Sequence, residues 1–223
     1  MRVVVTGASS RIGQAIVRLL GAEGHYVIAL YRSRRERVLE ALGGSKGEIH
    51  QLDLRDENAI QAFATKVGEI DALVNNAGIL AKGLEVVHVN LIGTIRLTEA
   101  LMPKMALRSS IVFIGDALAD GGMRDYPHYA ASKAGLKAYA LSLAKLLAPR
   151  VRVNVVEPGI IKTDLLESDA GLEGKFRKAV PLGRLGSPMD VARAVLFVLQ
   201  EEYLNGCILR VDGGLAITNL ANI

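Results

Sequence analysis

Short apolar runs alternate with segments of helical period along the whole chain, and this alternation is the strongest constraint on its fold. The runs are rich in Val and Ile and almost continuously apolar, which is typical of parallel strands buried on both faces. We expect strands at Arg2–Thr6, Tyr26–Tyr31, Glu48–Asp53, Ala72–Asn75, Ser110–Gly115, Val151–Glu157 and Cys207–Val211. We expect helices at Ile12–Glu23, Arg35–Leu42, Glu57–Val67, Leu84–Met105, Tyr126–Ala148 and Met189–Gln200. Strands separated by helices predict right-handed βαβ units in one doubly wound α/β sheet, mainly parallel and seven-stranded.

The composition excludes several classes of protein. Half of the 223 residues are hydrophobic, which indicates a globular chain with a large core, and the length suits one domain. The net charge of +4 is modest and only 4% of residues are aromatic, so we expect no nucleic-acid partner. No apolar run is long enough to cross a bilayer and no signal-peptide pattern opens the chain, so we expect a cytoplasmic protein without a membrane partner. The single cysteine, Cys207, fits a reducing compartment and is expected as a small buried residue in the last strand.

One long stretch, from Lys162 to Pro188, shows no clear period. In a compact domain such a stretch is often a functional lid, so we expect one here. The pattern indicates no metal site.

The first strand runs directly into a glycine-containing turn that opens a helix. Gly7 permits the tight turn, and Gly13 lets the helix pack closely against the sheet. The free N–H groups and the dipole of the helix N-terminus suit the pyrophosphate of a dinucleotide. We therefore expect a cofactor at the segment Gly7, Ser9, Ser10, Arg11, Ile12 and Gly13, where Arg11 adds a permanent cation.

The end of the second strand distinguishes NAD from NADP. An NAD site places an acidic residue there, but no acid occurs between Tyr26 and Arg35. Arg32 and Ser33 instead offer a guanidinium and a hydroxyl, the donors that a 2′-phosphate needs. We predict NADP(H), with Arg11 and Arg32 converging on that phosphate.

Two further strand ends complete the predicted cofactor site. Asp53 and Leu54 end the third strand, where they would flank the adenine. Asn76, Ala77 and Gly78 follow the fourth strand, where small residues let the backbone approach the cofactor.

Tyr129 and Lys133 lie four residues apart in a strongly helical segment, so both project from one face of the helix. A cation beside a phenol favours the ionised form, and we expect it to lower the pKa of Tyr129 towards neutrality. The tyrosine could then donate a proton to a carbonyl or accept one from an alcohol.

The glycine turn, Asn-Asn-Ala-Gly, Tyr-x-x-x-Lys and the Pro158-Gly159 pair together resemble the short-chain dehydrogenase/reductase superfamily of classical type, from Arg2 to about Leu215. The resemblance implies a Rossmann fold, Tyr129 as the acid/base, and Lys133 as a further ligand of the nicotinamide ribose. It also implies that Asn90 holds a water in the proton relay. By the same resemblance Pro158, Gly159, Ile161 and Thr163 meet the nicotinamide carboxamide, and Asp212-Gly213-Gly214 forms the turn after the last strand.

The chain departs from the family pattern at Asp116. The family usually has a serine thirteen residues before the tyrosine, but that position here is Asp116, and an ionised carboxylate cannot donate a hydrogen bond to a ketone. With Arg11 and the pair Arg32-Ser33, this position is similar to the pteridine reductase and dihydromonapterin reductase subgroup. In that subgroup the Asp bonds amino and ring N–H groups of a pterin and passes protons with the tyrosine.

The segment between Gly78 and Asn90 is also shorter than in most relatives. It leads into the helix that commonly pairs subunits, so the usual tetramer is not assured. We expect a homodimer or homotetramer joined through Leu84–Met105 and Tyr126–Ala148.

Three functions remain open on the sequence. The first is NADPH-dependent reduction of a small molecule, best a pterin-type C=N, by a single domain (residues 1–223) that carries both cofactor and substrate sites. The second is carbonyl reduction, as by a 3-oxoacyl-carrier-protein reductase or a sugar dehydrogenase. The third is a regulatory protein that senses NADP without chemistry.

Overall fold

The computed structural model describes residues 1–163 and 170–218. Within this part of the chain seven strands form one sheet in the order β3-β2-β1-β4-β5-β6-β7, and all six neighbouring pairs are parallel. The strands are β1 (Arg2–Val5), β2 (Tyr26–Tyr31), β3 (Gly47–Gln51), β4 (Ile70–Asn75), β5 (Met105–Ile114), β6 (Val151–Pro158) and β7 (Ile208–Val211). The predicted doubly wound α/β fold is confirmed.

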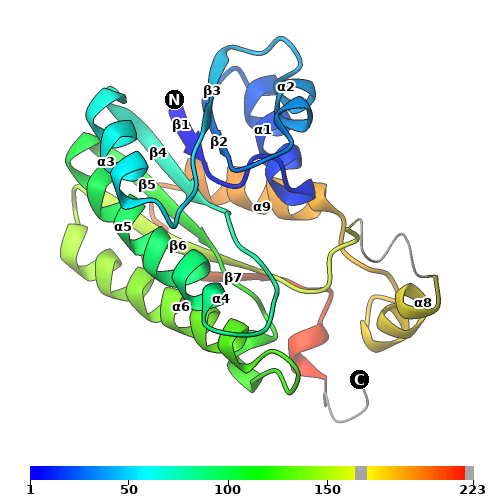
Figure 1. Ribbon diagram of the computed structural model, residues 1–223. Coiled ribbons are helices and arrows are strands. Elements are labelled where there is room, and N and C mark those ends of the chain that lie inside the picture. Colours follow the sequence, from blue (N-terminus) through cyan, green and yellow to red (C-terminus); the bar gives the residue numbers. More distant parts are fainter. Residues whose placement is uncertain (164–169, 219–223) are drawn as a thin grey trace.

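Helices cover both faces of the sheet (Figure 1). On one face lie α1 (Arg11–Ala22), α2 (Arg35–Leu42) and α9 (Pro188–Gln200), which share one hydrophobic cluster. On the other lie α3 (Glu57–Lys66), α5 (Thr94–Leu101) and α6 (Pro127–Leu147), which share a second cluster. Within β1, Val3 and Val5 join the first cluster and Val4 joins the second, which is why the strand is apolar at every position.

The helix predicted at Leu84–Met105 forms over Glu85–Lys104 and changes type along its length. It consists of the short helix α4 (Glu85–Val87), a π-helical segment (His88–Gly93), α5 and a 3₁₀ turn (Met102–Lys104). Pro103 lies in this last turn and cannot continue the helical hydrogen bonds, and Met105 already begins β5. The helix prediction was therefore correct for Glu85–Lys104 and wrong for Met105, and the wider π-helical turn carries Asn90.

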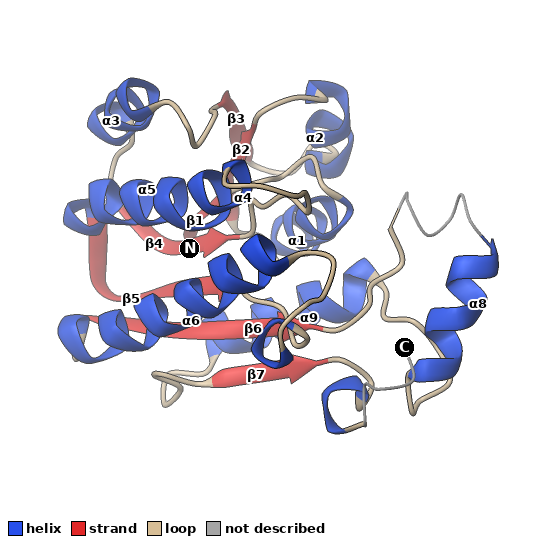
Figure 2. Ribbon diagram, turned by 60° about the horizontal axis from the view of Figure 1, so that its bottom comes forward, coloured by secondary structure: helices blue, strands red, loops and turns tan. Residues whose placement is uncertain are grey.

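A second correction concerns the stretch Lys162–Pro188. It contains a helix, α8 (Ala170–Ala179), which stands apart from the sheet in Figures 1 and 2. Glycines and four charged residues interrupt its apolar pattern, so no helical period was visible in the sequence. Residues 164–169 of this stretch lie outside the described residues.

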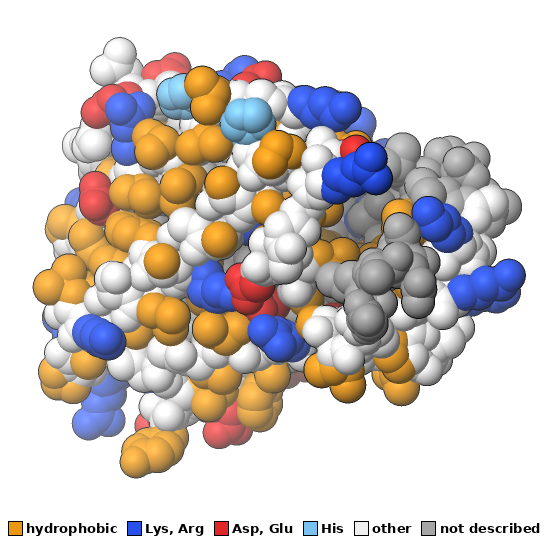
Figure 3. Space-filling model, turned by 90° about the horizontal axis from the view of Figure 1, so that it is seen from below, with side chains coloured by type: hydrophobic (Ala, Val, Ile, Leu, Met, Phe, Trp, Pro, Cys, Tyr) orange, Lys and Arg blue, Asp and Glu red, His pale blue; other side chains and the backbone are white. Residues whose placement is uncertain are grey.

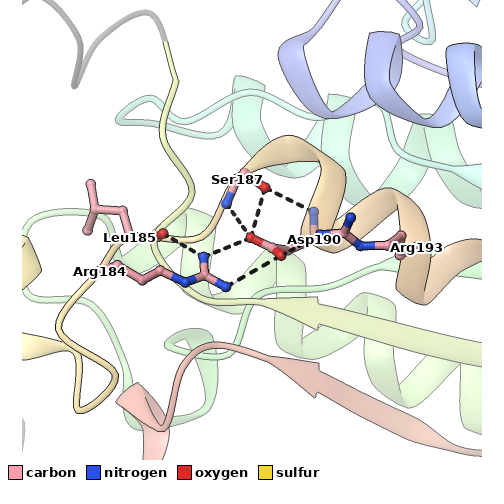
Figure 4. Close-up of polar contacts among 5 residues, drawn as sticks. All are labelled: Arg184, Leu185, Ser187, Asp190 and Arg193. Carbon is pink, nitrogen blue, oxygen red and sulfur yellow. Dashed lines mark hydrogen bonds and ion pairs between the residues drawn. The ribbon is translucent and has the colours of Figure 1, made fainter.

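The stretch rejoins the fold at Gly186, which forms a bridge with Ile161 just before α9 begins. Ser187 caps α9 in a capping box with Asp190, whose Oδ2 accepts from the Ser187 backbone N at 2.8 Å. Arg184 and Arg193 both donate to the same carboxylate, at 2.9 and 3.0 Å (Figure 4). These contacts fix where the chain returns to the sheet, and the hydrogen bond from Arg184 holds the pKa of Asp190 below its usual range.

Two smaller expectations can be compared with the structure. Cys207 lies one residue before β7 and is half-buried, so its expected place inside a buried strand was wrong. Among residues 1–163 and 170–218, no helix combines the length and apolar character needed to span a membrane.

Candidate functional site

A cleft of about 580 Å³ opens at the carboxyl ends of the parallel strands. It includes the point between β1 and β4 where the strand order reverses, the usual ligand site of a doubly wound fold. Most of the predicted site residues line it: Gly7, Ser9, Ser10, Ile12, Arg32, Ser33, Asp53, Leu54, Asn76, Ala77, Gly78, Asp116, Tyr129, Lys133, Pro158, Gly159, Ile161 and Thr163. Arg11, Gly13 and Asn90 are not among the lining residues.

The turn after β1 is closely packed on two sides, against the segment after β4 and against the start of α1. Gly7 has a φ of +63°, and a Cβ there would lie 2.7 Å from the Cα of Ala77. At Gly13 a Cβ would lie 2.2 Å from the Gly7 carbonyl oxygen, so Gly13 packs behind the turn and does not line the cleft. Ser10 caps α1 by accepting from the Gly13 backbone N at 3.0 Å. The result is a close-packed backbone cradle at a helix N-terminus, which fits a pyrophosphate.

Asn76 ties this turn to the end of β4. Its Nδ2 donates to the carbonyl oxygens of Thr6 at 2.9 Å and Gly7 at 3.1 Å. The side chain of Asn76 therefore joins the end of β4 to the end of β1 beside the cleft.

Cations line the cleft at the end of β2. Arg32, Ser33 and Arg34 are exposed lining residues, and Arg34 precedes α2 in a left-handed conformation with a φ of 60°. Arg34 also lines the cleft, whereas Arg11 is not among its lining residues, and the convergence of Arg11 and Arg32 on a 2′-phosphate stays a prediction. The run of arginines after Tyr31 contained the signal for Arg34, but only the conformation of the turn shows which of them faces the cleft.

At the end of β3, Asp53 faces the cleft while its carboxylate is held by Arg55. The backbone N and Nε of Arg55 both donate to Oδ1 of Asp53 at 3.0 Å. These hydrogen bonds hold the pKa of Asp53 below its ordinary value, so the group is an ionised acceptor.

Tyr129 and Asp116 form the polar centre of the opposite end of the cleft. Tyr129 lies in the first turn of α6, and its hydroxyl donates to Oδ2 of Asp116 at 2.7 Å. The other oxygen, Oδ1, accepts from the backbone N of Leu118 at 2.8 Å. Asp116 therefore acts as a double acceptor in this arrangement.

Lys133 lies one helical turn after Tyr129 and is only 6% exposed. Its Nζ donates to the carbonyl oxygen of Ile114 at 2.8 Å and lies 5.8 Å from the centre of the Tyr129 ring. Burial lowers the pKa of Lys133 to about 8, an effect that the nearby charge of Asp116 partly offsets.

The pKa of Tyr129 is shifted upwards. Burial is the largest cause, and the charge and the hydrogen bond of Asp116 add to it. The expectation that Lys133 would lower this pKa was therefore wrong. Lys133 points to Ile114, whereas the carboxylate of Asp116 contacts the phenol directly.

Asn90 supports the cleft from behind. Its Nδ2 donates to the carbonyl oxygen of Ile79 at 2.9 Å, and its Oδ1 accepts from the Ile79 backbone N at 2.8 Å. Nδ2 also lies 3.3 Å from the Ser132 hydroxyl. Asn90 thus anchors the segment after β4, which includes the lining residue Ile79 that the motifs did not reveal.

The end of β6 supplies the remaining wall. Gly159 donates its backbone N–H to the Val211 carbonyl oxygen at 3.0 Å, which joins this wall to β7. Asp212 caps the predicted turn by accepting from the Gly214 backbone N at 2.9 Å. Within the described residues, no group of three or more His, Cys, Asp or Glu side chains is arranged to hold a metal ion.

Comparisons with known proteins agree with this geometry. A family model described as enoyl-(acyl carrier protein) reductase matches residues 7–216. The chain is 38% identical to carbonyl reductase family member 4 of Danio rerio, over 96% of this chain and 97% of that protein. It is 36% identical to the 3-oxoacyl-[acyl-carrier-protein] reductase FabG of Escherichia coli K12, over 95% and 96% of the two chains. The solved structure of BdcA in complex with NADPH superposes with a TM-score of 0.87 at 26% identity, covering 95% of this chain and 93% of that chain.

Proposed function

This chain belongs to the short-chain dehydrogenase/reductase family of oxidoreductases, and we propose that it is an NADPH-dependent reductase that protonates its substrate through Tyr129. Two features of the cleft and one comparison support the cofactor. The close-packed turn at Gly7 fits a pyrophosphate, and Arg32 and Ser33 at the end of β2 fit a 2′-phosphate. The similarity to a structure that holds NADPH supports the same proposal.

When bound, NADPH supplies a hydride to the substrate. Tyr129 retains its proton at neutral pH because its pKa is raised, so it can donate that proton to the atom that gains the electron pair. Lys133, largely charged at neutral pH, would bind the ribose hydroxyls and stabilise the tyrosinate left behind. Asn90 keeps the wall at Ile79 in place.

One observation supports the substrate class: both carboxylate oxygens of Asp116 act as acceptors, one from Tyr129 and one from Leu118. A ketone oxygen would find no donor at this position. A heterocycle with amino or ring N–H groups could donate to the carboxylate while Tyr129 protonates the ring nitrogen. We therefore propose a pterin-type C=N bond as the first candidate, reduced to CH–NH by one hydride and one proton.

The relatives favour a second candidate. Two of them are named a carbonyl reductase and a 3-oxoacyl-[acyl-carrier-protein] reductase, which supports a ketone or 3-oxoacyl thioester. In that case Tyr129 alone would donate to the substrate oxygen.

The direct test is to measure NADPH oxidation with dihydrobiopterin, dihydrofolate, an acetoacetyl thioester and a simple diketone under identical conditions. The first candidate predicts the highest kcat/KM for a dihydropterin. Turnover of the thioester or the diketone without pterin turnover would establish the second candidate instead.

We also propose that the chain forms a homodimer or homotetramer through the face that carries α5 and α6. Hydrophobic side chains gather on this face in Figure 3, and Leu84 and Leu146 are 65% and 71% exposed. Sedimentation of the wild type and of a Leu146→Lys variant tests this surface, because the variant should lower the assembly state. A cytoplasmic location is proposed on the sequence pattern.

A further inference from the structure

Four charged side chains from four elements meet behind the catalytic end of the cleft. They are Asp120 in the 3₁₀ turn Ala119–Gly121, Lys137 on α6, Glu157 at the end of β6 and Arg210 on β7. Lys137 pairs with Asp120 and lies 3.2 Å from Oε1 of Glu157. Arg210 reaches Oε2 of Glu157 at 3.3 Å and Oδ2 of Asp120 at 3.8 Å. We call these four residues the charge cluster.

Glu157 is the buried member of the charge cluster, with only 1% of its surface exposed. A buried carboxylate is costly unless it is paired and hydrogen-bonded, and here two cations flank it. The proposed reaction uses neither Glu157 nor Lys137. The cluster therefore needs an explanation outside the proton donation by Tyr129.

The loop between β5 and α6 connects the charge cluster to the reacting groups. At its start, a Cβ on Gly115 would lie 2.9 Å from Cγ of Glu157, so this glycine makes room for the buried acid. The next residue is Asp116. Four residues further on, Asp120 is held by Lys137 and Arg210.

Helix α6 carries the partners of both acids. Tyr129 and Lys137 are eight residues apart, which places them on one stripe of the helix about two turns from each other. Tyr129 contacts Asp116 and Lys137 contacts Asp120, so the same loop and the same helix are joined twice. Backbone hydrogen bonds from Gly115 and Ala117 to β6 hold the start of the loop, at 2.8 and 2.9 Å, and the Asp120–Lys137 pair holds the part that follows Asp116.

We infer that Asp120 and Lys137 are positioning residues: their ion pair fixes the loop so that Asp116 meets Tyr129 at hydrogen-bond distance. The inference rests on the proposed function only in that Asp116 works beside Tyr129 in the reaction. A displacement of about 1 Å at reacting groups can lower the rate by up to about 100-fold.

Asp120→Asn is the variant of choice, because Glu157 keeps both of its cations and the buried charge remains paired. We expect kcat to fall about tenfold, within the range that misplaced reacting groups produce, with an unchanged Kd for NADPH. Asp125→Asn is the matched control, since Asp125 is an exposed carboxylate on the same loop. It should leave kcat unchanged.

The decisive comparison repeats Asp120→Asn in an Asp116→Ser background. If Asp120 acts through Asp116, Asp120→Asn causes no further loss of kcat in the Asp116→Ser background. An equal loss in both backgrounds, or no loss in the wild type, would overturn the inference.

Amide hydrogen exchange tests the same connection without turnover. The N–H of Leu118 donates to Asp116, so it should exchange faster in Asp120→Asn than in the wild type or in Asp125→Asn. Unchanged exchange at Leu118 would overturn the inference even if every substrate of the panel failed. Faster exchange with no turnover on the panel would support the positioning role and reject the proposed function.

Discussion

At the end of β2 the charged residues that line the cleft are exposed, whereas at the β5–α6 end they are partly or fully buried and Asp116 contacts Tyr129. Arg32 and Arg34 are exposed at the first end. At the second, Lys133 is 6% exposed and Tyr129 donates to Asp116 at 2.7 Å. The two ends of the cleft therefore differ in the burial of their charged and polar side chains.

The difference follows from the cost of burial. Exposed charges are well solvated, so they can be placed or removed with little effect on folding and act mainly on a bound anion. Buried groups have shifted pKa values, upwards for Tyr129 and down to about 8 for Lys133. Substitutions at the β2 end should therefore change the Kd for the cofactor, and those at the β5–α6 end should change kcat.

The largest effect is expected from Tyr129→Phe. Loss of the phenol removes the proton donor, and kcat should fall by about 10²–10⁴ with little change in the Kd for NADPH. Stopped-flow NADPH oxidation and a fluorescence titration of NADPH measure the two quantities. A variant with wild-type kcat would remove Tyr129 from the mechanism. A wild type without turnover on any substrate would instead favour a protein that only senses the dinucleotide.

A smaller effect is expected from Arg32→Ala. The contact to a 2′-phosphate is charge-assisted and worth about 1.5–3 kcal/mol, so the Kd for NADPH should rise about 10–100-fold while the Kd for NADH stays constant. Arg35→Ala is the matched control, because Arg35 belongs to the same basic run but does not line the cleft. Equal weakening of NADPH and NADH by Arg32→Ala would reject the phosphate assignment.

The smallest effect concerns pH. Lys133 is protonated below its pKa of about 8 and loses its charge as the pH rises through that value. Since kcat/KM reports ionisations of the free enzyme, kcat/KM for NADPH should fall above about pH 8, by at most about tenfold per pH unit. In Lys133→Arg this fall should disappear, because a guanidinium keeps its charge. A profile that is flat to pH 10 in the wild type would contradict the assignment.

Much of the fold and of the cleft was predictable because the residues that determine them lie close together in the sequence or recur at a regular spacing. Strands such as β1 are buried on both faces, which leaves a continuous apolar run in the sequence. The spacing of Tyr129 and Lys133 placed both on one face of α6, and the glycine turn after β1 marked the cleft.

Other features depend on contacts between distant segments. The pKa of Tyr129 is raised first by burial and then by Asp116, and both effects come from segments distant in the chain, so the neighbouring Lys133 alone was misleading. Helix α8 lacks a regular apolar face, and its sequence resembles a loop. Arg34, a lining residue, stands in the left-handed turn before α2, a conformation that the run of arginines does not reveal. The ion pairs of Glu157 join strands and a helix far apart in the chain.

The central claim is that Asp116 and Tyr129 work as a pair on a substrate that donates a hydrogen bond to the carboxylate. The most direct measurement is the ratio of kcat/KM for a dihydropterin to that for a diketone, in the wild type and in Asp116→Ser. A hydrogen bond to a charged group is worth about 1.5–3 kcal/mol, so the ratio should fall at least about tenfold, with diketone turnover retained or improved. An Asp116→Ser variant that reduces the dihydropterin as fast as the wild type would contradict the account.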